Sequence, residues 1–347
     1  MNLDVLNLTG LPAEVDEHIT SHKCSSKTNP HMDVLINVLN RVPAAAQRMA
    51  DHGIPAKIIS DTFADVGLWA HRCMRQNGVW GLAAPSIDWL ENHLACRIFR
   101  VGRYQCIPRY LPDDWNIRFY RNKYTNQVTA LFTTEEKFRN DGQFSGTGGV
   151  ECDASGFTTF FNENADGFTG YMASPKGYAI DKVVELKRGE WVECLKAGMP
   201  ILELHIPVDG DFKMETCRKS LTDMADFAKN HFDAIGKLTG VHGAFTAFTL
   251  SSWLLGTQLD GILPPSSNLV QHLRQYYLLP VLCPEDSGAF WIFDGKEIDY
   301  ESPQPEDMKT SLQRGVIKFK REGGKLWYNR GVVFLDDVDK FGQGCYR

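Results

Sequence analysis

The hydrophobic positions of the chain follow two different patterns, and the change between them lies near residue 95. Before it, apolar residues recur every three or four positions in segments 43–52, 55–77 and 86–94, as on one face of an α-helix. Gly53 ends the first of these segments, and Pro55 stands where a first-turn proline belongs. The pattern predicts a helical domain over residues 1–95.

After residue 95 the apolar residues alternate or form short runs. Segments 97–106, 117–124, 127–134 and 158–164 are typical of β-strands separated by glycine and asparagine turns. Residues 138–156 are glycine-rich and polar, which predicts a mobile surface loop. The GTGG of this loop lacks the following Lys-Ser and helix that a phosphate-binding loop requires.

Short turn signals predict hairpins at residues 188–189, 294–295 and 323–324. The last two lie in a tail, residues 281–347, that we expect to be rich in β-hairpins. We therefore expect an α+β protein with a helical N-terminal domain, 1–95, and a second domain, 96–347.

Residues 200–232 predict a strand, a turn and an amphipathic helix. The strand covers residues 200–208, and Gly210 lies in the turn after it. Because side chains alternate along a strand, Glu203 and His205 share one face. A carboxylate and an imidazole are therefore expected to be neighbours in a cleft.

A second strand-to-helix unit follows, with a strand at residues 245–255 and a helical pattern at 259–280. Ser266 or Ser267 is suited to cap the helix after two prolines. Two such units in succession favour neighbouring parallel strands, and the ends of such strands often form a ligand site.

Composition and charge exclude several kinds of partner. The chain has 347 residues and a net charge of −6, and it contains no basic stripe, so nucleic acid is not expected as a partner. No signal peptide or membrane-length apolar stretch is visible, which predicts a cytoplasmic protein without a membrane. Nine scattered cysteines without a C-x-x-C pair predict free thiols.

A metal site is not expected. His18, His22 and Cys24 lie close together in the sequence, but no second ligand pair follows, and a tetrahedral site needs three or four ligands.

An ordered set of short motifs resembles a known family. The set contains GRYQ at residues 102–105, LxxxxWxxxLxxGxPILxLHIP ending at 207, SL at 220–221, SSWLL at 251–255 and PPSSNL ending at 269. It is similar to a predicted bacterial acyltransferase family with a helical N-terminal domain and a GNAT-like C-terminal domain. The match runs to about residue 280, with an enlargement between 105 and 180.

The resemblance implies a GNAT-like mixed sheet flanked by helices, in which two central strands splay apart. Acetyl-CoA or another acyl-CoA would enter between them as co-substrate, and an amine of a small molecule would attack its thioester directly. The resemblance places the following residues at the cofactor: Ile206, Val208, Gly210, Lys213 and Asn268.

The same resemblance suggests catalytic and acceptor residues. Either His205 or Glu203 would act as the base, because a neutral imidazole beside a carboxylate is suited to proton transfer at neutral pH. Tyr276 lies near the place of a tyrosine that protonates the departing thiolate. Candidate contacts to the acceptor are Arg103, Gln105, Ser251 and Trp253.

The chain departs from the family pattern at the strand–helix turn. GNAT proteins usually carry R/Q-x-x-G-x-G/A there, whereas this chain has VDGDFKMET, in which Asp209, Asp211 and Glu215 surround Gly210. An alternative is therefore a non-catalytic small-molecule-binding protein on a degenerate GNAT fold.

Two further points stay open. A hydrolase or carbohydrate-directed protein would use aromatic residues such as Trp115, Tyr120 and Trp191, but no spaced carboxylate pair identifies it. The protein is also a possible homo-oligomer.

Overall fold

A computed structural model describes residues 3–24 and 29–347 of the chain. These residues form two compact units. The first unit joins residues 1–109 to two later segments, 202–211 and 219–244, and the remaining residues form the second unit.

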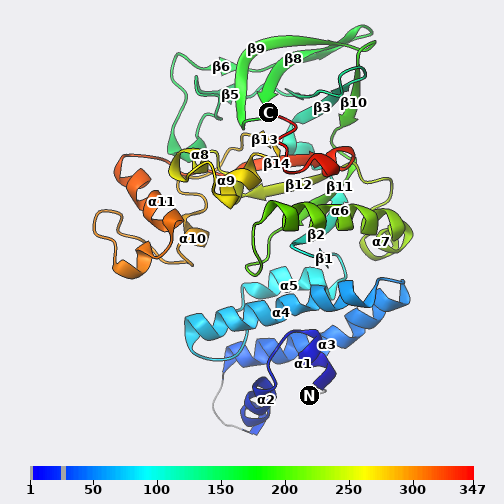
Figure 1. The fold of residues 1–347 in the computed structure, drawn as a ribbon, viewed down its shortest axis with the longest axis vertical. Coiled ribbons are helices and arrows are strands. Elements are labelled where there is room, and N and C mark those ends of the chain that lie inside the picture. The colour runs from blue at the N-terminus through cyan, green and yellow to red at the C-terminus, as the bar shows by residue number, and fades with distance from the viewer. Residues whose placement is uncertain (1–2, 25–28) are drawn as a thin grey trace. The chain divides into compact units, whose positions relative to one another are not determined.

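Helices dominate the N-terminal part of the first unit (Figure 1). They are α1 (Leu3–Leu8), α2 (Glu14–Cys24), α3 (Pro30–Asp51), α4 (Ala56–Asn77) and α5 (Ser86–Leu94). Helices α3, α4 and α5 contact one another, and their apolar faces form the local core. Two later helices follow, α6 (Met214–Asn230), most of which belongs to this unit, and α7 (Phe232–Thr239).

The helix predicted at residues 43–52 is present, but its predicted first residue is wrong. One helix, α3, runs from Pro30 through Pro43 to Asp51. Its N-terminus is capped by Asn29, whose side chain accepts a hydrogen bond from the backbone of Met32. A proline inside a helix removes a backbone hydrogen bond, but burial of one whole apolar face of α3 outweighs that cost.

Three strands complete the first unit in the order β1 (Phe99–Val101), β2 (Tyr104–Tyr110) and β11 (Pro200–His205). The first two residues of β11 belong to the second unit and the rest to the first. The single strand predicted at residues 97–106 is wrong, because β1 and β2 form an antiparallel hairpin. The chain reverses at Gly102, whose φ of +62° is a left-handed conformation that glycine adopts without strain.

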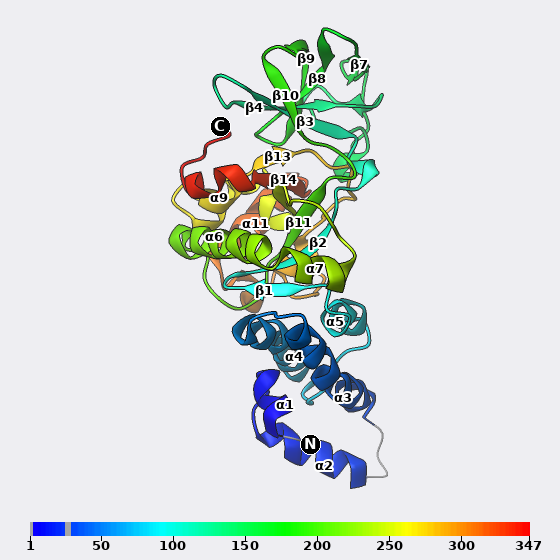
Figure 2. The same ribbon diagram turned by 90° about the vertical axis from the view of Figure 1, so that its right-hand side faces the viewer.

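The second unit contains the remaining strands (Figure 2). Strand β14 (Asn329–Phe334) pairs antiparallel with β12 (Ala247–Ser252) and with β13 (Tyr277–Leu279). A second sheet has the order β10 (Trp191–Leu195), β3 (Ile117–Asn122), β4 (Val128–Phe132), β8 (Gly167–Ser174) and β7 (Phe161–Glu163), with β9 (Tyr178–Lys187) also on β8. Short strands β5 (Lys137–Phe138) and β6 (Phe157–Thr158) pair with each other.

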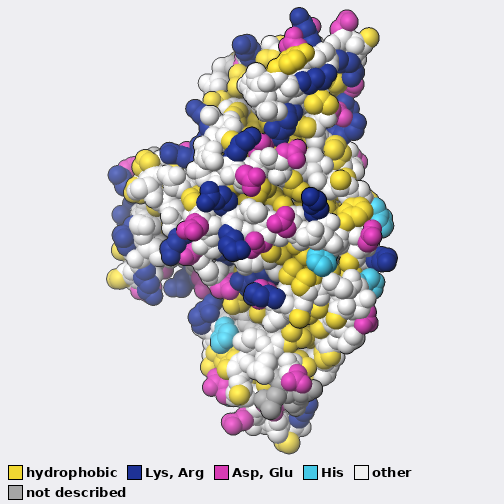
Figure 3. All heavy atoms as spheres, turned by 45° about the vertical axis from the view of Figure 1, so that its right-hand side comes forward, with side chains coloured by type: hydrophobic (Ala, Val, Ile, Leu, Met, Phe, Trp, Pro, Cys, Tyr) yellow, Lys and Arg dark blue, Asp and Glu magenta, His cyan; other side chains and the backbone are white. Residues whose placement is uncertain are grey.

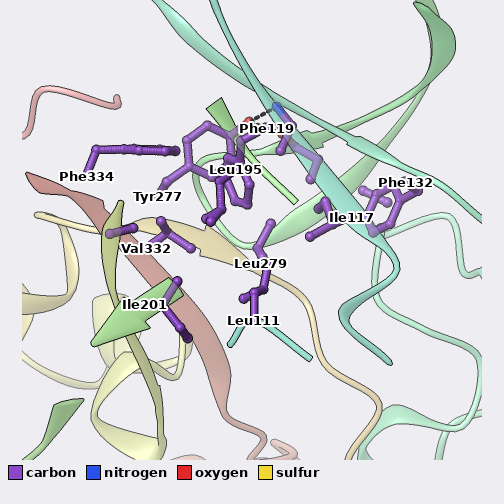
Figure 4. Packing of buried hydrophobic residues seen from close by; sticks show 14 of the residues in the cluster. Leu111, Ile117, Phe119, Phe132, Leu195, Ile201, Tyr277, Leu279, Val332 and Phe334 are labelled. Atoms are coloured by element: carbon purple, nitrogen blue, oxygen red, sulfur yellow. Dashed lines mark hydrogen bonds between the residues drawn. The ribbon is translucent and has the colours of Figure 1, made fainter. Parts of the chain in front are cut away.

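The core of the second unit lies between these sheets, as Figure 4 shows. Phe119 of β3 packs edge-on against Tyr277 of β13 and against Phe334 of β14. The buried hydroxyl of Tyr277 accepts a hydrogen bond from the backbone of Ala130 and donates one to the carbonyl of Ala173. This tyrosine therefore ties β13 to β4 and β8.

The helix predicted over residues 259–280 is also wrong. The structure has two short helices, α8 (Leu259–Ile262) and α9 (Asn268–Leu273), and then strand β13. Leu273 and Tyr277 were expected on one buried face of this helix. Both are buried, but Tyr277 belongs to strand β13. Spacing alone does not separate a short buried strand from a helix.

None of the three predicted hairpins is present in the described part of the chain. Strand β9 pairs with β8 and β10 with β3, so the turn at 188–189 joins strands that have other partners. Asp294 and Gly295 have positive φ angles of 53° and 84°, which suits a tight turn, but they follow helix α10 (Ala289–Ile292). Residues 323–324 follow helix α11 (Ser311–Arg321).

Short 3₁₀-helices of one or two turns connect these elements. They are η1 (Asp113–Trp115), η2 (Thr147–Gly149), η3 (Trp253–Leu255), η4 (Pro305–Met308) and η5 (Leu335–Lys340). The predicted surface loop at 138–156 is partly buried, because Thr147 and Gly148 are inside and Arg139 donates a 2.9 Å hydrogen bond to the Thr147 carbonyl. The α+β class predicted from the sequence is confirmed.

Candidate active site

Glu203 and His205 lie on the same face of β11, and their neighbours Leu202 and Leu204 are buried on the other. The Glu203 Oε2 and His205 Nε2 atoms are 3.8 Å apart, and the side chains are 21% and 31% exposed. The separation is too long for a direct hydrogen bond but short enough for the carboxylate to attract the imidazole ring when the ring is protonated. The prediction that these two residues are neighbours is confirmed.

Arg109 joins this pair from strand β2. Its Nε lies 2.8 Å from Oε2 of Glu203, so the carboxylate is held between a guanidinium and an imidazole. Sequence reasoning missed Arg109, although it follows Gln105 by four positions. Residues four apart on a strand share one face, and this spacing was the available signal.

An aromatic ring lies against His205. The rings of Trp89 and His205 have centroids 4.7 Å apart and meet edge to face at 61°. Trp89 comes from α5, and its indole N–H donates a 2.8 Å hydrogen bond to Oδ2 of Asp65 in α4. The same Oδ2 accepts a 3.1 Å hydrogen bond from the indole of Trp69 and lies 3.3 Å from Nε2 of His93.

Asp65 is a buried anion within a set of donors. Its side chain is 4% exposed. Burial alone would raise its pKa, but the hydrogen bonds from His93, Trp89 and Gln105 together outweigh burial and lower the pKa below the ordinary value of 3.8. The carboxyl group is therefore ionised at neutral pH, and it binds the N–H of the same indole that contacts His205.

Gln105 belongs to this buried set. Its amide nitrogen lies 3.4 Å from Nε2 of His93, and both residues are almost completely inaccessible. Gln105 was predicted as a contact to the acceptor. The structure places it in the interior, where its amide contacts His93.

Arg103, also predicted to contact the acceptor, holds the turn after β11. Its Nη1 donates a 2.8 Å hydrogen bond to the carbonyl of Pro207, and its Nε donates one of 2.9 Å to the carbonyl of Asp211. Gly210 lies over the arginine stem with a φ of +84°, and a Cβ there would come within 3.3 Å of Arg103 Cδ. The conformation of the turn therefore depends on Arg103.

The acidic character of this turn is partly neutralised. Nη2 of Arg100 lies 2.7 Å from Oδ2 of Asp209. The sequence suggested that Asp209 would repel a pyrophosphate. Its pairing with Arg100 removes much of that repulsion, whereas Asp211 and Glu215 are exposed.

Ser220 connects two of the sequence motifs. Its hydroxyl accepts hydrogen bonds from the backbone N–H groups of Arg103 (3.0 Å) and Tyr104 (3.3 Å) and donates one to the Val101 carbonyl. A Cβ at Gly102 would lie 3.1 Å from the Ser220 Oγ. The GRYQ motif and the SL motif thus form one structural feature.

The other predicted residues of the first unit lie beside this turn. Ile206 is half-buried, and the Val208 side chain points into solvent with 71% of its surface exposed.

The remaining predicted residues belong to the second unit. Lys213 is exposed just before α6, Asn268 is the first residue of α9, and Ser251 is exposed on β12, while Trp253 lies half-buried in η3. Tyr276 is fully buried, with its hydroxyl 3.2 Å from Nε2 of His272.

Basic and acidic side chains are intermingled on the face drawn in Figure 3. No three histidine, cysteine or acidic side chains gather into a possible metal site in the described residues, and His22 is paired with Asp33.

Every cysteine of the chain lies in the described part, and all of them are free thiols. Within residues 3–24 and 29–347, no helix has both the length and the apolar character needed to cross a membrane.

Solved structures with the same fold are acyltransferases. One, in complex with decanoyl-CoA and teicoplanin, is 19% identical, with a TM-score of 0.52 over 86% of this chain and 64% of that chain. Another, a mutant in complex with octanoyl-CoA, is 18% identical, with a TM-score of 0.54 over 92% of this chain and 75% of that one. This chain thus spans less than two thirds of the length of the first structure. At a sequence identity of 19%, the structural similarity shows a common fold and no more.

A search of curated proteins found no match. The model of the N-acyltransferase N-terminal domain matches residues 8–96, and the model of the GNAT-like C-terminal domain matches residues 98–333. These matches confirm the resemblance to an acyltransferase family that the sequence motifs indicated. They also confirm the predicted GNAT-like fold. Because the second match covers more than half of the chain, the protein belongs to the family defined by the GNAT-like C-terminal domain.

Proposed function

We propose that this protein is an N-acyltransferase that moves an acyl group from acyl-CoA to an amine of a small molecule by direct attack. The observation that carries the proposal is the partly exposed pair of Glu203 and His205 on β11, in a chain of this family. Solved acyltransferases of the same fold bind decanoyl-CoA, octanoyl-CoA and teicoplanin, which supports both an acyl-CoA donor and a small-molecule acceptor.

In this proposal His205 is the general base. Its Nε2 has no hydrogen-bond partner in the described residues, and this atom is buried although 31% of the side chain is exposed. In the proposal, a bound amine reaches this nitrogen and passes to it the proton that the amine loses on forming the new C–N bond. Glu203, at 3.8 Å, stabilises the imidazolium that results, and Arg109 keeps the Glu203 carboxylate in place. Bound acyl-CoA would supply the thioester that the amine attacks. Its C–S bond would break as the C–N bond forms, and CoA would leave as a thiolate that takes a proton from the His205 imidazolium or from water.

The turn after β11 is compatible with the pyrophosphate of acyl-CoA. Gly210 has no side chain to block the approach of an anion to the backbone, Asp209 is paired with Arg100, and the Arg103 guanidinium fixes the turn. The proposed cofactor contacts in the first unit are Ile206, Val208 and Gly210. The roles of Lys213, Asn268, Ser251 and Trp253, which belong to the second unit, stay predictions from the sequence. Tyr276 stays outside this proposal because its hydroxyl is buried against His272.

A second candidate function is non-catalytic binding of a small molecule on the same fold. Asp211 and Glu215 favour it, because both are exposed acidic residues at the turn where GNAT proteins usually bind pyrophosphate.

Calorimetric titration with CoA, acetyl-CoA and decanoyl-CoA separates the two functions. Saturable binding with an affinity of about 10 μM or tighter, corresponding to roughly −7 kcal/mol, supports the acyltransferase. An absence of binding at millimolar ligand would exclude acyl-CoA as the donor. His205→Ala should bind acyl-CoA as the native protein does.

Transfer is then measured with a panel of amines by mass spectrometry of the acylated product. Mass spectrometry is preferred to thiol reagents, because the chain carries exposed thiols at Cys24 and Cys345. His205→Ala and Glu203→Gln should both lose transfer while retaining acyl-CoA binding. Unchanged transfer in both variants would remove the assigned base.

A further inference from the structure

We propose that Asp65 is a positioning residue for His205 and acts through the indole of Trp89. The inference rests on the proposed function, since it assigns how the candidate base is held. Asp65 does not touch His205. It binds the N–H of Trp89, and the Trp89 ring contacts the imidazole edge to face.

The hydrogen bond adds a directional contact to the packing of Trp89. Trp89 is half-buried and comes from α5, so part of its ring is not enclosed by neighbouring side chains. The 2.8 Å bond from its N–H to Asp65 sets the direction of the ring. The edge-to-face contact with His205 then sets the position of the imidazole.

Asp65 is well suited to this role because it is itself immobilised. Its carboxylate is 4% exposed and lies 3.3 Å from Nε2 of His93 in α5. Burial and His93 are expected to keep it in place when the longer, 3.1 Å hydrogen bond from Trp69 is removed. The charged groups around His205 are Glu203 on its own strand, Arg109 on β2 and the anion of Asp65 beyond Trp89.

The chain offers a matched pair of tryptophans to test this. Trp69 and Trp89 are both half-buried, and both donate to the same oxygen of Asp65. Of these two, Trp89 has the ring contact with His205. Trp69→Phe and Trp89→Phe therefore each remove one donor from Asp65, and Trp89→Phe also disturbs the contact to the imidazole.

Asp65→Asn tests the hydrogen bond to Trp89 separately from the Trp89 ring itself. It keeps the Trp89 ring but replaces the charged acceptor by a weaker neutral one, so Trp89 loses its strong anchor. If Asp65 acts only on stability, Asp65→Asn leaves His205 as it is in the native protein. If Asp65 positions His205, then Asp65→Asn and Trp89→Phe change His205 in the same sense.

The first measurement does not depend on activity. NMR spectra of the full-length chain with ¹³C-labelled histidine give the ring signals of His205, which are assigned by their loss in His205→Ala. We expect the signals to shift or broaden in Asp65→Asn and Trp89→Phe and to stay in place in Trp69→Phe. Unmoved signals in Asp65→Asn, or an equal change in Trp69→Phe, would overturn the proposal.

The second measurement is kinetic. We expect kcat to fall about tenfold in Asp65→Asn and Trp89→Phe with the KM for acyl-CoA unchanged, because a misplaced base affects the chemical step. Trp69→Phe should keep kcat within about twofold of the native value. If the native protein transfers no acyl group, the proposed function fails, and the NMR result alone decides the positioning role. If Asp65→Asn does not fold, Asp65→Glu replaces it, because it keeps the charge but displaces the carboxylate that binds Trp89, and it should change the His205 signals in the same sense.

Discussion

At the scale of single residues, buried polar side chains determine the backbone geometry around the candidate site. Ser220 is the clearest case, because one hydroxyl serves two N–H groups and one carbonyl at the reversal between β1 and β2. This reversal places Arg103 behind the turn that follows β11. The position of Arg103 therefore depends on a serine that lies far away in the sequence.

Replacing Ser220 by alanine should destabilise the protein by about 2 kcal/mol, because buried backbone groups lose a polar partner. The free energy of unfolding is measured by urea denaturation. Ser155→Ala, at an exposed serine, is the control and should change it by less than about 0.5 kcal/mol. Equal effects in the two variants would show that the Ser220 hydroxyl has no special role.

A second residue determines how stability depends on pH. Asp337 is buried, its carboxylate lies 2.7 Å from Arg121 and 2.9 Å from Lys340, and it accepts a 3.1 Å hydrogen bond from the Tyr346 hydroxyl. Burial alone would raise its pKa, but Arg121 and Lys340 lower it below 3.8.

Because the folded-state pKa of Asp337 is depressed, its contribution to stability is complete above the unfolded-state pKa of about 3.9 and is lost as the pH falls through the folded-state value. We expect Asp337→Asn to be less stable than the native protein at pH 7, with a difference that closes below pH 3.8. Urea denaturation across this pH range measures the difference. It should be absent at all pH values in Asp336→Asn, at the exposed neighbouring residue.

At the scale of elements, the turn between β11 and α6 combines a left-handed glycine with a buried arginine. Gly210→Ala should cost about 1–2 kcal/mol of stability from its φ of +84° and should also displace Arg103. Acyl-CoA affinity, measured by calorimetry, should fall about tenfold.

Gly240, at the end of α7, offers a matched control for Gly210. Its φ is +77°, and a Cβ there would meet nothing within 4 Å. Gly240→Ala should therefore cost similar stability and leave acyl-CoA affinity unchanged. If both alanine variants bind equally well, the turn is not the pyrophosphate site.

Helices, strands and turns were predictable from the sequence where the pattern that determines them lies within one short segment. The strand and helix of residues 200–232 form as their apolar spacing predicts, with Cys217, Leu221 and Met224 buried on one face of α6. The turn at Asp294 and Gly295 has the backbone conformation that its sequence favours, but pairing depends on distant partners, and no strands flank it.

The candidate site was predictable to a similar extent. Strand periodicity placed Glu203 beside His205, whereas the residues that hold them come from other segments. Asp65 and Trp89 lie on two helices, and their contact with the site depends on how those helices pack against the strand. No spacing within one segment reveals such a contact. The roles predicted for the site residues and the domain boundary at residue 95 stay predictions.

At the scale of the whole molecule, the first unit contains residues from both family matches. Helix α4 contacts β1, and the hydroxyl of Thr62 accepts a 2.9 Å hydrogen bond from the backbone N–H of Arg100. His93 and Gln105 meet in the same unit. The N-terminal helices therefore share one core with strands that follow residue 97.

A fragment of residues 1–96 should consequently be helical but less stable than the same helices in the full chain. Amide hydrogen exchange measures this, and we expect protection of α4 to fall by at least about tenfold in the fragment, equivalent to roughly 1.4 kcal/mol. Equal protection in the fragment and the full chain would show that the helices fold independently.

The position of Trp89 and Asp65 behind His205 has a consequence for exchanging modules between relatives. A chimera joined near residue 97 would combine the indole and carboxylate of one parent with the β11 imidazole of the other. The two matches to domain models meet at that point, yet the groups around His205 come from both sides of it. A working hybrid should therefore need Asp65, Trp89 and the β11 strand from the same parent.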